Sequence, residues 1–340
     1  MANVQFGLII RGQFSGSDDM TVRFQELLEQ ARLADHLGFA SLTMGMHYST
    51  APLQSLQQLP FLARTMAEAP RLRLNFGAIV LPLHKPLDLA ENLATMDVMS
   101  GGRVIFSAAL GYREVESRAF GTWQKDRVQR FEENLEAIKR LWTEASVEMV
   151  GSHFELSGAS VSVRPVQKPY PPIWIAANAD AAIRRAARLG DCWYVNPHNR
   201  IDTIVRQVEV YRHALDEQKK PFPAEFPARR EVFVARSREE ALRLCRPFLE
   251  TKYAVYREWG QDRAMPVGDN DFDVDFDSLV RDRFLLGSPE EVAAQVVDLN
   301  RATGINHLIM SVQWPGMPQS MVLEVLHLLA EDVIPLVEKA

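Results

Sequence analysis

The sequence predicts one α/β domain over residues 1–340, a (β/α)8 barrel of the TIM-barrel architecture with insertions at its C-terminal face. Short apolar runs of strand length alternate with longer segments whose apolar residues recur at helical spacing, which is typical of a parallel sheet with helical crossovers. Eight such strand–helix repeats are present, and eight repeats fit a closed barrel better than an open sheet. No segment rich in Gly, Pro or Ser divides the chain, which favours one domain.

The predicted strands are short and apolar, and the first of them is β-branched at its ends. In chain order they cover residues 4–10, 39–44, 72–81, 103–110, 172–177, 192–197, 229–235 and 305–312.

Amphipathic segments follow the strands and predict the helices around the barrel. They cover residues 21–38, 54–69, 86–100, 126–145, 180–190, 200–218, 237–260, 288–304 and 320–340. Gly38 stands where a C-cap glycine ends the first helix, and Ser288 with Pro289 has the pattern of a helix start.

Two segments interrupt the alternation and account for the extra length. Residues 147–170 predict a small hairpin or insertion, and the acidic residues near 262–285 predict a loop. This loop lacks the glycine at the sixth position and the glutamate at the twelfth that a calcium-binding loop requires. We expect it to be solvated, and its closing as a lid over the barrel mouth is a hypothesis.

Composition argues against several classes of partner. The net charge is −6 and the isoelectric point is near 5.8, so no basic face for nucleic acid or an anionic membrane is expected. Neither a signal peptide nor a membrane-spanning stretch of about 18 apolar residues is recognisable. Cys192 and Cys245 have no metal-site or disulfide spacing, and a cytoplasmic location is the expectation.

A histidine stands at the end of the second predicted strand. Gly45, Met46 and His47 follow residues 39–44, and active sites of such barrels lie at the C-terminal ends of the strands. A histidine that merely ties down a loop is the ordinary alternative. The barrel architecture favours a functional role for His47.

Other unusual residues follow the remaining strands. They are His84, Tyr112, Glu116, Asn178, His198, Gln313 and Trp314. Each has an ordinary alternative, such as helix capping by Asn178, a solvated Glu116–Arg118 pair or loop packing by Trp314. Together, with free N–H groups at a helix N-terminus near Asn178, they predict a mixed polar and aromatic cavity with an anion site. Such a cavity suits a large, planar, phosphorylated cofactor.

Six segments carry a family resemblance over nearly the full length. They are residues 31–47, 80–104, 110–121, 130–142, 165–177 and 316–335, the second of them reading VLPLHKPLDLAENLATMDVMSGGRV. In this order they resemble the bacterial luciferase-like flavin monooxygenases, a superfamily of (β/α)8 barrels.

The resemblance implies reduced FMN or the deazaflavin F420 at the C-terminal mouth. In the FMN branch a separate flavin reductase supplies the reduced flavin, which forms a C4a-peroxide with O2 and transfers one oxygen to a small organic substrate. The protein then has to bind and orient the flavin and the substrate and to keep water out of the cavity. The resemblance also implies a homodimer.

The resemblance assigns roles to individual positions. His47 lines the cavity and can act as a base, although Met46 replaces the acidic residue that often precedes it. Tyr112 and Glu116 lie beside the flavin, and Ala78 and Ile79 lie where the family places a non-prolyl cis peptide under the ring. The turn of Ala177, Asn178 and Ala179 binds the phosphate, and Asp180 is expected to point outward.

His84, His198, Gln313 and Trp314 are the candidate substrate contacts, and no metal site is expected. Two alternatives remain open at this point: an F420-dependent dehydrogenase or reductase, and a flavin-binding protein without catalysis. The block 111–121 favours the FMN-dependent monooxygenase.

Overall fold

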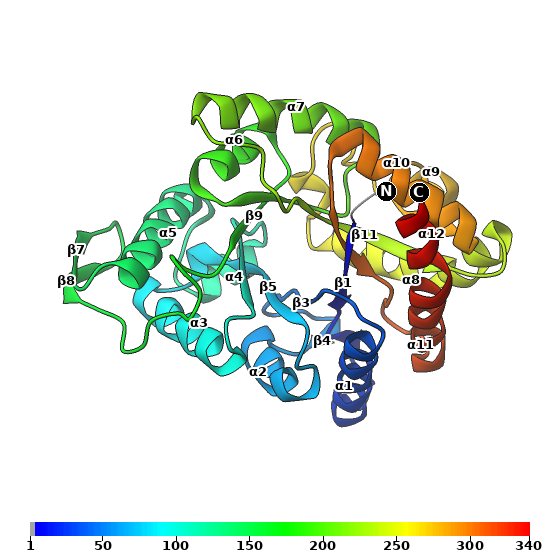
Figure 1. The fold of residues 1–340 in the computed structure, drawn as a ribbon, viewed down its shortest axis with the longest axis horizontal. Coiled ribbons are helices and arrows are strands. Elements are labelled where there is room, and N and C mark those ends of the chain that lie inside the picture. Colours follow the sequence, from blue (N-terminus) through cyan, green and yellow to red (C-terminus); the bar gives the residue numbers. More distant parts are fainter. Residues whose placement is uncertain (1–3) are drawn as a thin grey trace.

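The computed structural model describes residues 4–340, in which eight parallel strands close into a barrel (Figure 1). The strands are β1 (Gln5–Ile10), β3 (Ser41–Met44), β5 (Arg73–Val80), β6 (Val104–Ala109), β9 (Ile173–Ala177), β10 (Cys192–Val195), β11 (Pro227–Val234) and β13 (His307–Ser311). They pair in the order β10-β9-β6-β5-β3-β1-β13-β11, and the β10–β11 pair closes the ring. The predicted (β/α)8 barrel is therefore confirmed. Seven of its strands lie within the predicted segments, and β11 begins two residues before the predicted segment 229–235.

The helices cover the outside of the barrel. They are α1 (Met20–His36), α2 (Gln58–Glu68), α3 (Pro86–Ser100), α5 (Arg127–Thr143), α6 (Asp180–Leu189), α7 (Ile201–Glu217), α8 (Arg238–Glu258), α10 (Pro289–Thr303), α11 (Gln319–Leu328) and α12 (Ile334–Lys339). Ser288 caps α10 in a reciprocal capping box with Glu291, as its position in the sequence predicts. The predicted last helix is in fact two, because a π-helical turn over Leu329–Val333 separates α11 from α12.

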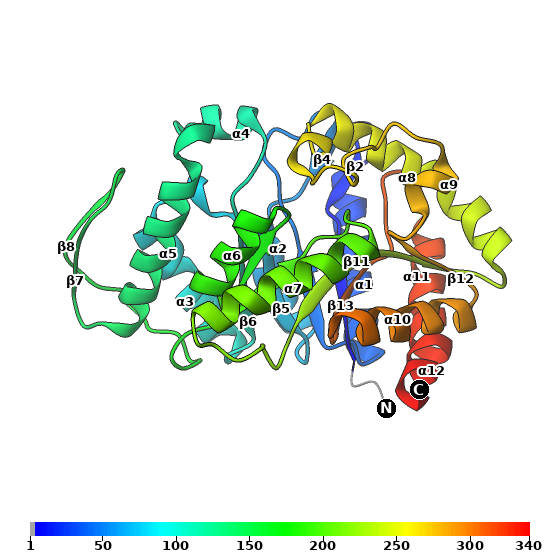
Figure 2. The ribbon, with the colours of Figure 1, turned by 90° about the horizontal axis from the view of Figure 1, so that it is seen from above.

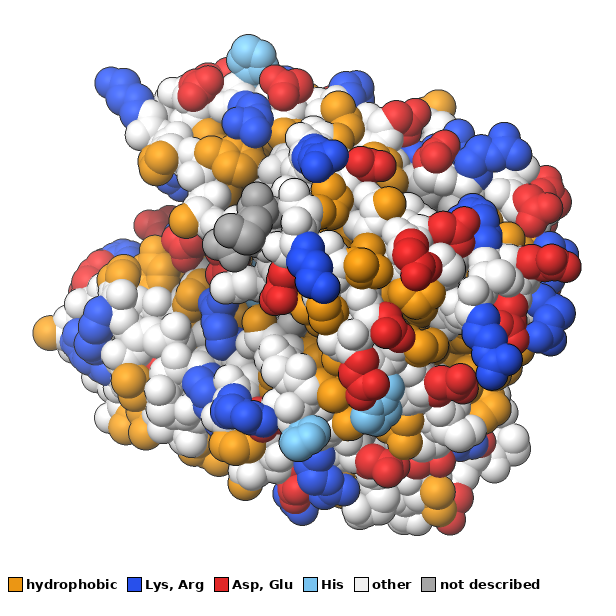
Figure 3. Space-filling model, turned by 45° about the vertical axis from the view of Figure 1, so that its right-hand side comes forward, with side chains coloured by type: hydrophobic (Ala, Val, Ile, Leu, Met, Phe, Trp, Pro, Cys, Tyr) orange, Lys and Arg blue, Asp and Glu red, His pale blue; other side chains and the backbone are white. Residues whose placement is uncertain are grey.

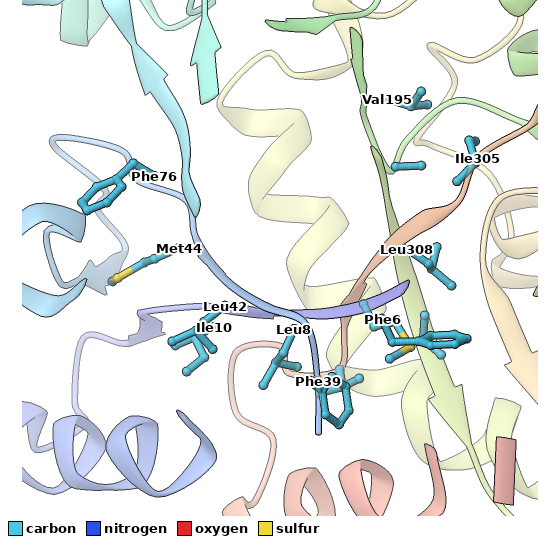
Figure 4. Close-up of a cluster of buried hydrophobic side chains, with 14 of the residues drawn as sticks. Phe6, Leu8, Ile10, Phe39, Leu42, Met44, Phe76, Val195, Ile305 and Leu308 are labelled. Atoms are coloured by element: carbon cyan, nitrogen blue, oxygen red, sulfur yellow. The ribbon is translucent and has the colours of Figure 1, made fainter. Parts of the chain in front are cut away.

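Successive side chains of a strand point alternately outward and inward and so form two apolar layers, one outside the barrel and one inside it. Phe6, Leu8 and Ile10 of β1 point outward and pack with side chains such as Phe39 in the layer between barrel and helices (Figure 4). Ile9 of β1 points inward, where a second cluster fills the barrel. Its members are Ile9, Ile105, Trp174, Cys192, Tyr194 and Ile309. Two members of this inner cluster, Ile9 and Tyr194, also line the cavity at the barrel mouth.

Additional elements surround the C-terminal mouth. Strand β2 (Gln13–Ser15) pairs with β4 (Leu53–Ser55), and α4 (Glu114–Ala119) follows β6. In Figure 2 these elements lie along the upper edge with the segment that follows α8, and the C-terminus lies below. The loops that leave the strands therefore gather on the side opposite to the C-terminus.

The two interrupting segments differ from each other in structure. Residues 147–170 contain the hairpin of β7 (Val147–Val150) and β8 (Glu155–Ala159), which projects from the barrel in both ribbon views. Residues 262–285 are more ordered than a solvated loop, since they contain η3 (Asp262–Ala264) and α9 (Phe276–Val280) and lead into β12 (Leu285–Gly287), paired with β11. The apolar side chains at positions 272 and 276 anchor this segment, because both are buried.

The surface carries interspersed charges. On the face drawn in Figure 3, acidic and basic side chains alternate without a continuous basic stripe. No helix of residues 4–340 combines the length and the apolar character that crossing a bilayer demands. Short 3-10 turns, η1 (Leu81–Leu83) and η2 (Gln124–Asp126), complete the described elements.

Candidate active site

A cavity of about 460 Å³ opens at the C-terminal ends of the barrel strands. One of its walls is built from residues with little or no side chain, at the ends of β3, β5, β6 and β9. They are Gly45, Gly77, Ala78, Ala109, Gly111, Ala176 and Ala177. A methyl group on Gly111 would lie 2.4 Å from Val80 Cγ1, and φ of Gly111 is +75°. This wall therefore forms a smooth slot that larger side chains would fill.

The peptide between Gly77 and Ala78 is cis and lies in this slot. The sequence comparison placed such a bond at Ala78 and Ile79, so its position is corrected by one residue. Ala78 lines the cavity, whereas Ile79 is 1% exposed and packs in the layer outside the barrel. The pairing register of β5 shifts between Phe76 and Ile79, and beyond this irregularity Ile79 packs outside the barrel.

His47 lies in the cavity wall and is held by a buried carboxylate. Its Nδ1 atom is 2.9 Å from Glu116 Oε1, which also accepts hydrogen bonds from the backbone N–H of Tyr48 (2.9 Å) and from Arg113 Nη1 (3.3 Å). Burial raises the pKa of Glu116, but the hydrogen bonds and charges of its partners outweigh burial and lower the pKa below the ordinary value. An ionised Glu116 only accepts, so His47 Nδ1 carries the hydrogen and leaves Nε2 as its second, basic nitrogen.

This arrangement excludes the simpler pairing of Glu116 with Arg118. Arg118 instead pairs with Glu114 on the exposed side of α4, at 2.7 Å. Glu116 itself is 1% exposed and does not line the cavity, so it acts on the site through His47.

Aromatic rings surround His47. The ring centroids of Tyr112 and Trp259 lie 5.7 and 5.5 Å from that of His47, and Arg113 lies 4.2 Å above the Trp259 ring. The Tyr112 hydroxyl is buried and has no hydrogen-bond partner. Burial raises the pKa of Tyr112 far above its ordinary value, so this phenol keeps its proton and can donate it in a hydrogen bond.

The loop after β9 forms one rim of the cavity. Ala177, Asn178 and Ala179 line it directly before α6, whose first N–H groups are the type that binds anions. The Asn178 side chain donates to the Ala264 carbonyl at 3.3 Å, which fixes the rim to η3 rather than leaving the amide free.

The charges near this rim favour an anion. Asp180 pairs with Arg206 of α7 at 2.8 Å on the outer surface, so its carboxylate is turned away as expected. Arg127 and Arg263 also line the cavity. The sequence motifs did not identify these two arginines. Arg127 is the first residue of α5, and Arg263 lies in the acidic segment.

Four further candidate positions, in addition to Glu116, do not line the cavity. They are Ile79, His84, Gln313 and Trp314. His84 follows the turn η1, and burial lowers its pKa, which keeps it neutral. The Trp314 indole is buried and donates to Glu231 Oε2 at 2.6 Å, and Gln313 is 3% exposed.

His198 does line the cavity, beside Asn196. Its Nδ1 atom is 2.9 Å from the Tyr253 hydroxyl, and it packs against the rings of Tyr256 and Phe272. Burial lowers the pKa of His198 far below its ordinary value, so the ring is neutral at physiological pH.

Polar residues within or directly after the strands were missed. Tyr194 of β10 and Arg229 of β11 line the cavity, as do Arg11 directly after β1 and Tyr256 of α8. These strands are buried on both faces, so the sequence gives no alternation that would separate inward from outward positions. A charged residue within an apolar strand, such as Arg229, is the signal that could have found them.

Three comparisons with known proteins fit this architecture. A dimethylsulfone monooxygenase of Pseudomonas putida that depends on FMNH2 is 28% identical over 263 residues, covering 70% of this chain and 69% of that protein. An F420-dependent glucose-6-phosphate dehydrogenase of Amycolatopsis mediterranei is 25% identical over 320 residues, covering 92% and 94%. The crystal structure of monooxygenase RslO1 from Streptomyces bottropensis superposes with a TM-score of 0.85 at 27% identity, covering 99% and 100%.

The family model described as luciferase-like monooxygenase matches residues 4–307, which include seven of the eight barrel strands and the first residue of β13. The structural neighbours share the barrel over nearly the whole chain. The chain therefore belongs to the luciferase-like monooxygenase family of oxidoreductases.

Proposed function

We propose that the protein is the oxygenase component of a two-component system, using reduced FMN and O2 to oxygenate a small organic substrate. The observation that carries the proposal is the slot of Gly and Ala side chains that runs from an anion-binding rim to His47. Relatives that bear the names of monooxygenases support it. A separate flavin reductase is then the functional partner.

The residues present fit the cofactor. The slot at Gly77, Ala78 and Ala109 has room for a flat ring because larger side chains are missing there. The hydroxyl of Tyr112 is a buried donor without a partner, which a polar ring atom can satisfy. The backbone at Ala179 with Arg127 would hold the phosphate.

The chemistry divides between cofactor and protein. Bound reduced flavin supplies the reaction with O2. His47 Nε2 accepts or returns a proton at the reacting centre, because Glu116 fixes the hydrogen of the imidazole on Nδ1. Met265 lines the cavity and Trp259 packs against His47, so both are placed to limit the access of water.

F420-dependent hydride transfer is the second candidate function. The glucose-6-phosphate dehydrogenase relative covers nearly the whole chain, and a deazaflavin ring has the same flat shape as a flavin ring. The two candidates differ in their need for O2, because hydride transfer consumes none.

Anaerobic titrations test the proposal. The protein is titrated with reduced FMN, reduced riboflavin and reduced F420, and binding is followed by fluorescence. We expect reduced FMN to bind more tightly than riboflavin and F420. Arg127→Gln should weaken the binding of reduced FMN and leave the binding of reduced riboflavin unchanged. Arg243→Gln, at an exposed position, is the matched control. Binding of F420 without binding of FMN would contradict the proposal and support the second candidate.

A further inference from the structure

We propose that the substrate carries an anionic group, a carboxylate or sulfonate, and that Arg229 binds it with the Tyr194 hydroxyl at the bottom of the cavity. This inference rests on the proposed function, since it places the substrate in the same cavity. It deepens that function by naming the chemical class of the substrate.

The charges of the cavity wall are of one sign. The ionised side chains that line it are those of Arg11, Arg127, Arg229 and Arg263. Among residues 4–340, no aspartate or glutamate lines the cavity. A cavity enclosed by guanidinium groups favours an anionic ligand by simple electrostatic attraction.

Three of these arginines are accounted for by hydrogen bonds within the protein or by a place near the proposed phosphate site. Arg11 donates to Glu231 (3.2 Å), to the Tyr256 hydroxyl (2.5 Å) and to Ser311 (3.2 Å). Arg127 and Arg263 lie in α5 and η3, close to the rim proposed for the phosphate.

Arg229 differs from them because its charge is not compensated. Its Nε atom is buried without a hydrogen-bond partner. The nearby carboxylate, Glu231, is already bound by Arg11, by the Lys252 ammonium and by the Trp314 indole. An arginine stays protonated in proteins, and Arg229 is only partly exposed and has no carboxylate of its own, which is unfavourable. A ligand anion would remove this cost.

Tyr194 offers a second donor beside Arg229. It lies on β10, the neighbour of β11 in the barrel, and its hydroxyl is buried with no well-formed hydrogen bond, although Thr43 lies nearby. Burial raises the pKa of Tyr194 to about 12, so the phenol keeps its hydrogen at neutral pH. A carboxylate or sulfonate has enough oxygen atoms to accept from both groups.

The other groups around Arg229 do not supply the missing negative charge. Arg11 and Lys252 are basic, and the neighbouring His198 is neutral. Tyr256 lies close as well, and its hydroxyl is used by Arg11 and Gln13.

The position of Arg229 argues for the substrate rather than the cofactor. The slot with the cis peptide lies on β5, and β11 stands four strands away in the ring of eight, on the opposite side of the barrel. In register, Arg229 lies beside Ile309 of the inner cluster, below the ends of the strands. The anion therefore comes from a molecule that fills the space between the slot and β11.

Anion binding and thermal stability test the inference together. The probes are benzoate and methanesulfonate, each paired with its neutral amide, benzamide or methanesulfonamide. They are added to the wild-type chain, to Arg229→Met and to the exposed control Arg243→Met, and binding is followed by calorimetry and by melting temperature.

We expect at least one anion to bind the wild-type chain and raise its melting temperature, and the neutral amides to have no effect. Arg229→Met should lower the affinity for that anion about tenfold or more, and Tyr194→Phe should lower it by a smaller factor. Arg229→Met without ligand should melt at the same temperature as the wild type or a higher one, because the partly buried guanidinium has no hydrogen bond at Nε to lose. A purely structural arginine would give the reverse.

Three results would overturn the inference: no anion binds, anions bind wild type and Arg229→Met equally, or Arg229→Met loses reduced FMN while the anions have no effect. The reduced-FMN titration of the wild type is a separate measurement. If the wild-type chain does not bind reduced FMN, the proposed function is refuted. If it binds reduced FMN but gives one of these three results, only the proposal of an anionic substrate is refuted.

Discussion

Replacement of Glu116 by glutamine tests the role of the His47–Glu116 pair. The substitution keeps size and shape but removes the negative charge that accepts three hydrogen bonds at Oε1. A glutamine can also donate its N–H to Nδ1 of His47, which would move the imidazole hydrogen to Nε2. The basic nitrogen that faces the cavity would then be lost.

The structure sets the size of two effects. Arg113 keeps its hydrogen bonds to the carbonyls of Tyr48 (2.6 Å) and Ser49 (2.8 Å) in this variant. The free energy of unfolding should therefore fall by only about 1–3 kcal/mol, which is less than breaking an isolated buried ion pair would cost. Turnover should fall about 100-fold, the lower range for losing a general base.

The assay compares kcat for an accepted substrate with the unfolding free energy in urea. His47→Ala should lower kcat by a similar factor, and the double variant should lose little more, because the two residues act as one unit. The affinity for reduced FMN should stay unchanged in Glu116→Gln. Turnover within threefold of the wild type, in a folded Glu116→Gln protein, would refute this reasoning.

Three further predictions concern the slot and the barrel base. Gly111→Ala should lower the free energy of unfolding by roughly 2–3 kcal/mol in urea, because φ is +75° and the new methyl would meet Val80 at 2.4 Å. Ala78→Leu should fill the slot and weaken reduced FMN about tenfold or more by titration, without a large change in melting temperature. Burial of Glu225 is outweighed by its hydrogen bonds, chiefly from His307, so its pKa falls from 4.5 to about 2. The stability that Glu225 provides should be complete above pH 4.5 and decline towards pH 2, and Glu225→Gln should remove that decline in acid unfolding.

The barrel was predictable from the sequence because its strands are apolar runs between amphipathic helices. All eight overlap the predicted segments, from residues 4–10 to residues 305–312, and only β11 begins earlier than predicted. Strands β2, β4 and β12 were not predicted, since three residues each are too short to show a period. The two parts of the last helix were also read as one, because its apolar spacing continues through the π-helical turn.

The site was predictable in part, because barrel geometry brings residues after strand ends together. His47, Tyr112, Asn178 and His198 follow strands and do line one cavity. His84 follows a strand as well, but the turn η1 carries it away from the mouth.

The role of Glu116 as partner of His47 depends on a contact between residues 69 positions apart, which no local pattern contains. Arg229 was hidden for another reason, since the inward face of a doubly buried strand has no signature of its own.

Oxygen reactivity of the bound cofactor tests the central claim most directly. The anaerobic complex with reduced FMN is mixed rapidly with oxygenated buffer, and flavin absorbance is followed against free reduced FMN and against the Ala78→Leu protein. The account predicts that oxidised flavin appears from the wild-type complex only after a transient species that both controls lack. Direct oxidation at the rate of free flavin, together with tight binding of reduced F420, would contradict it.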